Sequence, residues 1–186
     1  MAGTHVALIR GINVGRAKRI AMADLRALVE DLGYRDVRTL LNSGNVVFTT
    51  PRTVRGAADA RIENAMSARL GISARVTVIT AAELAAAVAR NPLGKLAHDP
   101  SRMLVAVLRD PKDRSRLAPL ARQDWAPEAF AIGPRVAYLW CPGGTIEGPL
   151  WAAVGRALGD GVTTRNWATM TKLHALVTDR KGGASG

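Results

Sequence analysis

The pattern of apolar and polar residues predicts alternating strands and helices in the first half of the chain. Short β-branched runs predict strands, and apolar residues at helical spacing that end at a glycine predict helices. The expected strands are Thr4–Arg10, Asp36–Leu41, Val46–Thr50 and Ser73–Thr80, and the expected helices run from Met22 to Leu32 and from Ile62 to Leu70. This β-α-β-β-α-β order is that of a split βαβ, or ferredoxin-like, unit.

The second half repeats this order of elements without repeating the residues. Asp110 and Pro111 fit the start of a helix, and a turn at Gly133-Pro134 separates two strands. The strands are Ser101–Leu108, Ala129–Ile132, Arg135–Cys141 and Val162–Thr164, and a further helix carries Leu150, Val154 and Leu158. We therefore predict an α+β protein with two tandem ferredoxin-like halves, a connecting helix and a C-terminal helix.

The predicted boundaries follow from breaks in these patterns. The first half covers residues 1–80, and the second half covers residues 101–165. Between them, residues 81–100 hold a connecting helix and a linker, with Thr80 and Glu83 at capping-box spacing. A helix that begins at Asn166 covers residues 166–180, and we expect residues 181–186 to be a disordered tail.

The first strand of each half is apolar on both faces. Val6–Ile9 and Met103–Leu108 contain no polar residue, whereas a strand in a sheet with one solvated face alternates. We therefore expect the second face of each sheet to be covered, by the other half or by a partner chain. This expectation argues against an open sheet that serves as a binding platform.

Composition indicates a globular protein of the cytoplasm. Hydrophobic residues make up 48% of 186 residues, and no apolar run is long enough to span a bilayer or to form a signal peptide. The single cysteine, Cys141, excludes an internal disulfide, and we interpret it as a buried apolar residue. With only three histidines, His5, His98 and His174, the sequence offers no Cys/His metal cluster, and we predict no metal and no cofactor.

The net charge of +11 favours polyanionic partners, but it has two interpretations. Residues 1–90 carry 13 Lys/Arg against 7 Asp/Glu, and residues 91–186 carry 13 against 8. This even spread, with arginine far more frequent than lysine, is typical of a compositional bias and of a diffuse, solvated positive surface. A dedicated polyanion-binding face is the alternative, and both remain open.

Three short polar motifs contain the candidate site residues. They are Leu8-Ile9-Arg10-Gly11-Ile12-Asn13-Val14-Gly15, Leu41-Asn42-Ser43-Gly44-Asn45-Val46-Val47-Phe48 and Thr163-Thr164-Arg165-Asn166-Trp167-Ala168-Thr169. In this order they resemble the bacterial family of unknown function numbered 1697, over about Val6 to Val177. The resemblance implies two ferredoxin-like subdomains and no established activity. The chain departs from the family pattern at Gly15-Arg16-Ala17-Lys18 and at Ala168. The resemblance therefore implies no role here for the residues that the family usually has at these positions.

The loop Arg10–Arg19 is the first candidate for binding. It holds four cations, two glycines and Asn13, and it leads to a helix N-terminus, an arrangement able to hold a phosphate or carboxylate. Alternatively, the glycines supply turns and Asn13 bonds the local backbone. The candidate ligand-binding residues in all three motifs are Arg10, Asn13, Gly15, Asn42, Ser43, Asn45, Arg165 and Asn166. Turn chemistry is an alternative explanation for Asn42, Ser43 and Asn45, and helix capping is an alternative explanation for Asn166.

The leading functional hypothesis is an anionic small molecule or nucleic acid bound near Arg10–Lys18. Arg10 would clamp the anion, Asn13 and Asn45 would orient it, and Arg165 would add charge if the halves bring it close. Two alternatives stay open, a small-molecule enzyme with a pocket between the halves and a structural subunit of a larger assembly. An RNA-recognition module is disfavoured, because aromatic residues make up only 4% of the chain and the first strand has none.

Overall fold

The chain is an α+β protein that contains two four-stranded antiparallel sheets. The computed structural model describes residues 3–16, 18–96, 98–144 and 148–182. The chain divides into two compact units, one formed by Met1–Ala82 with Ala175–Gly186 and the other by Glu83–His174. We call them unit 1 and unit 2.

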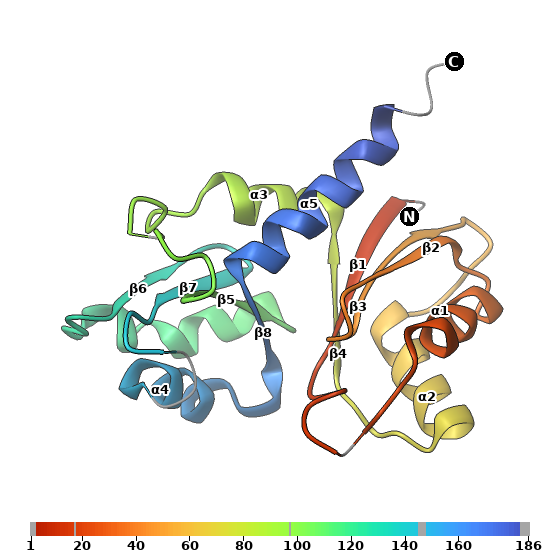
Figure 1. Ribbon diagram of the computed structural model, residues 1–186, viewed down its shortest axis with the longest axis horizontal. Coiled ribbons are helices and arrows are strands. Elements are labelled where there is room, and N and C mark those ends of the chain that lie inside the picture. The colour runs from red at the N-terminus through yellow and green to blue at the C-terminus, as the bar shows by residue number, and fades with distance from the viewer. Residues whose placement is uncertain (1–2, 17, 97, 145–147, 183–186) are drawn as a thin grey trace. The chain divides into compact units, whose positions relative to one another are not determined.

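Unit 1 is a sheet with two helices on one face (Figure 1). Its strands lie in the order β2-β3-β1-β4, and all neighbours are antiparallel. Leu25 of α1 and Met66 of α2 are fully buried against Ala7 and Phe48 of the sheet. In chain order the elements are β1 (Gly3–Ile9), α1 (Met22–Asp31), β2 (Arg35–Leu40), β3 (Asn45–Thr50), α2 (Ala58–Leu70) and β4 (Val76–Thr80).

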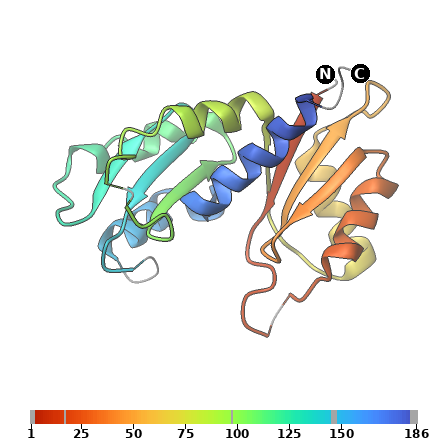
Figure 2. The ribbon, with the colours of Figure 1, turned by 45° about the horizontal axis from the view of Figure 1, so that its top comes forward.

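Unit 2 contains a second sheet in the order β6-β7-β5-β8. Helix α4 packs on one face through Leu150 and Val154, and α3 runs across the other, where Tyr138 Oη donates a hydrogen bond to Ala87 O at 2.8 Å (Figure 2). The elements after β4 are α3 (Ala81–Ala89), β5 (Met103–Leu108), the 3-10 helices η1 (Pro111–Leu117) and η2 (Leu120–Arg122), β6 (Ala129–Ile132), β7 (Val136–Trp140), α4 (Pro149–Leu158), η3 (Gly159–Gly161), β8 (Val162–Asn166) and α5 (Trp167–Gly182).

The first strand of each unit is buried on both faces. In β1, Ala7 and Ile9 contribute to the core beneath α1 and α2, while Val6 and Leu8 on the opposite face are also fully buried. In β5, all six residues are buried. For the first strand of each sheet, the prediction that the second face is covered is therefore confirmed, and neither of these strands offers an open surface for stacking bases.

Several local predictions differ from the structure, and β4 begins at Val76 and not at the predicted Ser73. The helix expected after Asp110 is a 3-10 helix, although Asp110 does cap it by accepting a bond from Lys112 N at 2.9 Å. Only Leu117 of that segment is buried, so it lacks the apolar face that would stabilise a longer α-helix. At the C-terminus, α5 continues to Gly182, and the rest of the expected tail, residues 183–186, lies outside the described residues.

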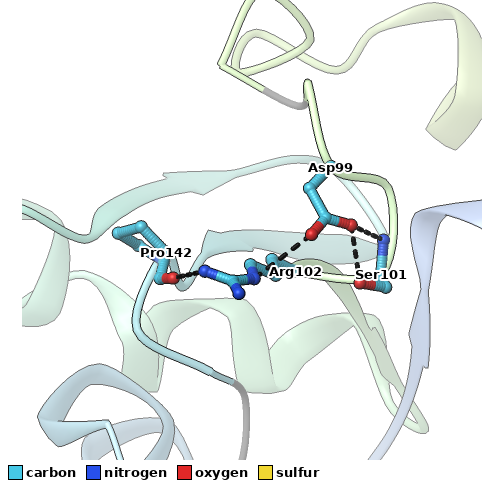
Figure 3. A network of polar contacts seen from close by, with 4 residues as sticks. All are labelled: Asp99, Ser101, Arg102 and Pro142. Carbon is cyan, nitrogen blue, oxygen red and sulfur yellow. Dashed lines mark hydrogen bonds and ion pairs between the residues drawn. The ribbon is translucent and has the colours of Figure 1, made fainter.

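A polar network fixes the segment that leads into β5 (Figure 3). The Asp99 carboxylate accepts hydrogen bonds from Ser101 N at 3.0 Å and Ser101 Oγ at 2.6 Å, and it pairs with Arg102 Nε at 3.2 Å. The bonds from Ser101 lower the pKa of Asp99. Arg102 also donates to the carbonyl of Pro142, so the network joins the end of the linker to the turn after β7. We assign it a structural role.

Candidate functional site

Asn13 closes the loop between β1 and α1. Its amide Nδ2 donates to Ile20 O at 2.9 Å, and its Oδ1 accepts from Ile20 N at 2.8 Å. Its backbone N–H donates to Lys18 O at 3.1 Å. Asn13 has a φ of 55°, which asparagine tolerates better than most residues. These bonds turn a cation-rich segment into a defined loop, as the structural interpretation of Asn13 predicts.

The same asparagine ties the loop to the β2–β3 hairpin. Nδ2 of Asn13 also donates to Asn42 O at 2.7 Å. The bond uses the backbone of Asn42, so the hairpin needs no particular side chain there. Two of the three motifs therefore lie side by side, joined by one amide group.

The hairpin tip is built around two residues in the left-handed region. Leu41 has a φ of 57° and Gly44 a φ of 79°, and Gly44 O accepts a bond from Ile9 N at 2.8 Å. Asn45 is fully buried, and its Nδ2 donates to Leu40 O at 2.8 Å and to Ser43 Oγ at 2.9 Å. Turn chemistry thus accounts for the amide hydrogens of Asn45, while Asn42 and Ser43 remain exposed at the tip.

A shallow cavity of about 370 Å³ opens where the loop meets the hairpin. Exposed Arg16, Lys18 and Arg19 project from the loop at this end of unit 1. Helix α1 begins here, and Ala21 at its N-cap brings no side-chain acceptor to the first amides. The cavity is lined by Asn13, Arg19, Ile20, Ala21, Met22 and Asn42, with no carboxylate among them.

Arg10 begins the predicted anion loop, and Gly15 lies near its middle. Arg10 directly follows β1, and its backbone N–H donates to Arg75 O at 2.9 Å, while its side chain is partly buried. Gly15 is exposed and has a φ of 62°, and Gly11 has a φ of 68°. Both glycines supply turns, as the structural interpretation predicts. Neither Arg10 nor Gly15 lines the cavity.

Arg165 and Asn166 belong to unit 2, whereas Arg10 belongs to unit 1. Arg165 lies in β8 opposite Val105, and its Nη1 donates to Thr164 O at 2.9 Å. Burial lowers the pKa of Arg165 to about 10. A site that combines Arg10 with Arg165 stays a prediction.

Asn166 caps α5, since its Oδ1 accepts from Thr169 N at 2.9 Å. We expect Asn166→Ala to lower the free energy of unfolding by about 1 kcal/mol, because it removes the acceptor for an amide in the first turn. Asn166→Asp keeps an acceptor and is the matched control. Urea denaturation followed by circular dichroism measures both. Equal losses in the two variants would contradict the capping role.

The described residues offer little for covalent or metal chemistry. Cys141 is buried, and its burial, with a smaller contribution from Glu128, raises the pKa of its thiol to about 12, so the reactive thiolate is suppressed. Within the described ranges, no three His, Cys, Asp or Glu side chains are grouped as a metal site would need. None of the described helices is long and apolar enough to cross a membrane.

A second cavity in unit 1 was not foreseen from the sequence. It is lined by residues of β1, β3, β4 and the segment before α2, including His5, Thr50, Arg52 and Arg55. The only signal in the sequence is the pair of arginines in the Pro-and-Gly-containing segment Pro51–Gly56. The juxtaposition of His5 and Thr50 depends on strand register, which no local pattern provides.

Comparison with known proteins places the chain in a family. The family model described as "Protein of unknown function (DUF1697)" matches residues 2–138. The chain belongs to this family. The matched region of this DUF1697 protein includes the loop after β1 and the β2–β3 hairpin, whereas Arg165 and Asn166 lie beyond it. The resemblance drawn from the motifs is thereby confirmed.

A solved structure has a similar fold. The conserved bacterial protein SP0830 from Streptococcus pneumoniae is 19% identical to the DUF1697 chain, with a TM-score of 0.76, and the match covers 96% of this chain and 99% of that chain. At this identity the likeness concerns the fold alone. Among curated proteins, none matches this chain.

Proposed function

We propose that this DUF1697 protein binds an anionic ligand, a molecule that carries a phosphate group, in the cavity beside the Arg10–Arg19 loop. The observation that carries the proposal is the closure of this loop by Asn13. The closed loop holds its cations next to a cavity whose lining contains Arg19 and no carboxylate. A cationic loop fixed by its own hydrogen bonds needs little reordering when it binds.

The start of α1 supports the same ligand chemistry. Amide N–H groups at a helix N-terminus favour negative charge, and here Ala21 supplies no competing side-chain cap. Asp24 in the first turn of α1 opposes an anion, but it does not line the cavity. In this proposal Arg19 contacts the anion directly, while Arg16 and Lys18 add a screened, longer-range attraction.

We also propose that the two units are tandem ferredoxin-like halves, with residues 1–80 and 101–165 as their main segments. The support is that β1 to β4 and β5 to β8 follow the same order, with the third strand beside the first in each sheet. With a single cysteine, the chain needs no oxidising compartment to fold, which supports a cytoplasmic location.

Isothermal titration calorimetry with inorganic pyrophosphate tests the ligand proposal. We expect Arg19→Gln to weaken binding by about fivefold, since a charge-assisted contact is worth roughly 1 kcal/mol at an exposed position. The matched control is Arg38→Gln, which removes an equally charged, exposed residue of β2 that lies outside the cavity. Equal weakening in both variants would show only a general charge effect.

Nucleic acid also carries phosphates, so a labelled single strand is titrated in parallel by fluorescence anisotropy. For a small-ligand site, pyrophosphate binding persists near physiological salt, while nucleic-acid binding falls steeply with salt and responds equally to Arg19→Gln and Arg38→Gln. Tight, salt-resistant nucleic-acid binding that Arg19→Gln abolishes would contradict a small-ligand site and favour nucleic acid.

A further inference from the structure

A second cavity lies at the opposite end of the unit 1 sheet. In the register of β1 and β3, Leu8 pairs with Asn45 near the first site, whereas His5 pairs with Phe48 towards the other end. The second cavity has a volume of about 860 Å³, within the range of small-molecule sites. It is lined by His5, Thr50, Pro51, Arg52, Val54, Arg55, Gly56, Ala58 and Val78.

The polar side chains at its base are held in place. His5 Nδ1 lies 3.0 Å from Gly3 O and 3.1 Å from Thr50 Oγ1. Because a carbonyl oxygen only accepts, Nδ1 carries the hydrogen that it donates to Gly3 O. The imidazole also stacks on Phe48, with ring centroids 5.7 Å apart. His5 and Thr50 therefore form a pre-organised polar pair from two neighbouring strands.

The rim of the cavity is cationic. Arg52 and Arg55 are both exposed and come from the segment that leads into α2, and the lining contains no carboxylate. Asp59, in the first turn of α2, is the neighbouring acidic residue, and it does not line the cavity.

The segment that carries both arginines is anchored by Arg61. Arg61 Nη1 donates to Arg55 O at 3.3 Å, and its Nη2 donates to Leu32 O at 2.8 Å. One side chain of α2 thus joins the cavity rim to the end of α1. This anchoring fixes the backbone of the segment at Arg55 without using the guanidinium groups of Arg52 or Arg55.

We infer that this cavity is a second binding site of unit 1, which takes a small organic anion with an apolar body and one phosphate or carboxylate group. The apolar body packs on Pro51, Val54 and Val78, while the anionic group is bound by the guanidinium groups of Arg52 and Arg55. Such a combination of an apolar wall with a few convergent polar groups is typical of small-molecule sites. The inference is independent of the ligand proposed for the Arg10–Arg19 loop.

The probe is phenyl phosphate, titrated into the full chain by isothermal titration calorimetry, with benzyl alcohol as the neutral counterpart of similar size. We expect phenyl phosphate to bind at least tenfold more tightly than benzyl alcohol. In the double variant Arg52→Gln/Arg55→Gln its affinity falls at least tenfold. Arg38→Gln, which changes an exposed arginine outside both cavities, leaves it within twofold, and circular dichroism verifies that each variant is folded.

Three results would overturn the inference. The first is no binding of phenyl phosphate to the wild-type chain. The second is equal affinity for benzyl alcohol, which would indicate an apolar site only. The third is a loss of affinity in Arg19→Gln with none in the double variant, which would place the anion at the loop after β1. Because the third result would support the loop site, a failure of the second-cavity inference is distinguishable from a failure of the proposed function.

Discussion

Replacing Gly44 with alanine is expected to destabilise unit 1 by about 3 kcal/mol, because backbone strain and overpacking act together. Gly44 has a φ of 79°, a conformation that L-residues rarely adopt. An added Cβ would lie 2.7 Å from Ile12 Cδ1 and 2.9 Å from Ile9 Cβ. Because Ile9 Cβ is fixed by the β1 backbone, the hairpin tip itself would have to move, and the bond from Ile9 N to Gly44 O would weaken.

Urea denaturation followed by circular dichroism measures this loss, and Gly11→Ala is its matched control. Gly11 has a similar φ of 68°, but no heavy atom lies within 4 Å of the position of its added Cβ. The Gly11→Ala variant therefore has the backbone strain without the steric clash, and its free energy of unfolding is expected to fall by about 1 kcal/mol. Equal losses at the two glycines would refute close packing of the hairpin on β1.

Asn13→Ala is expected to lower the free energy of unfolding by about 2–3 kcal/mol and to remove anion binding at the loop. The substitution deletes three side-chain hydrogen bonds, two to the backbone of Ile20 and one to Asn42 O. Ile20 is buried, so its N–H and carbonyl would lose partners that water replaces poorly. With the closure gone, Arg19 is no longer held beside the cavity.

Asn42→Ala tests whether the hairpin contacts Asn13 through its backbone alone, because it removes the side chain of Asn42 and keeps its carbonyl. The hydrogen bond from Asn13 ends on the Asn42 carbonyl, which this variant retains, so its stability is expected to change by less than about 0.5 kcal/mol. Stability is again measured by urea denaturation, and pyrophosphate affinity by calorimetry. A loss at Asn42 as large as that at Asn13 would show that the side chains, rather than the single amide, join loop and hairpin.

Much of the fold was predictable because each element has a local cause. Apolar residues at helical spacing predicted α1 with its start at Met22, and Gly71 ends α2 in the left-handed conformation that its position suggested. The lack of polar residues in β5 predicted burial of both faces. The prediction of an α-helix after Asp110 was wrong, because capping residues indicate where a helix starts and not whether it can pack against the core.

The candidate site was predictable only in part. The sequence indicates that Asn13 can bond local backbone, but its bond to Asn42 joins positions 29 residues apart and follows from tertiary structure. The positive φ at the hairpin tip falls on Leu41 as well as Gly44, and no propensity points to a leucine there. The second cavity depends on the register that brings His5 beside Thr50, which composition and spacing do not specify.

In the proposed function, part of the positive charge of this DUF1697 protein forms a localised anion site at the Arg10–Arg19 loop. A ¹H–¹⁵N NMR titration of the labelled full chain with inorganic pyrophosphate at physiological salt tests whether this site exists. We predict saturable shifts concentrated in the amides of Gly11–Met22 and Asn42, with no comparable shifts around Arg38. Weak, unsaturable shifts spread over exposed arginines throughout the chain would contradict the claim and make the net charge a feature of composition alone.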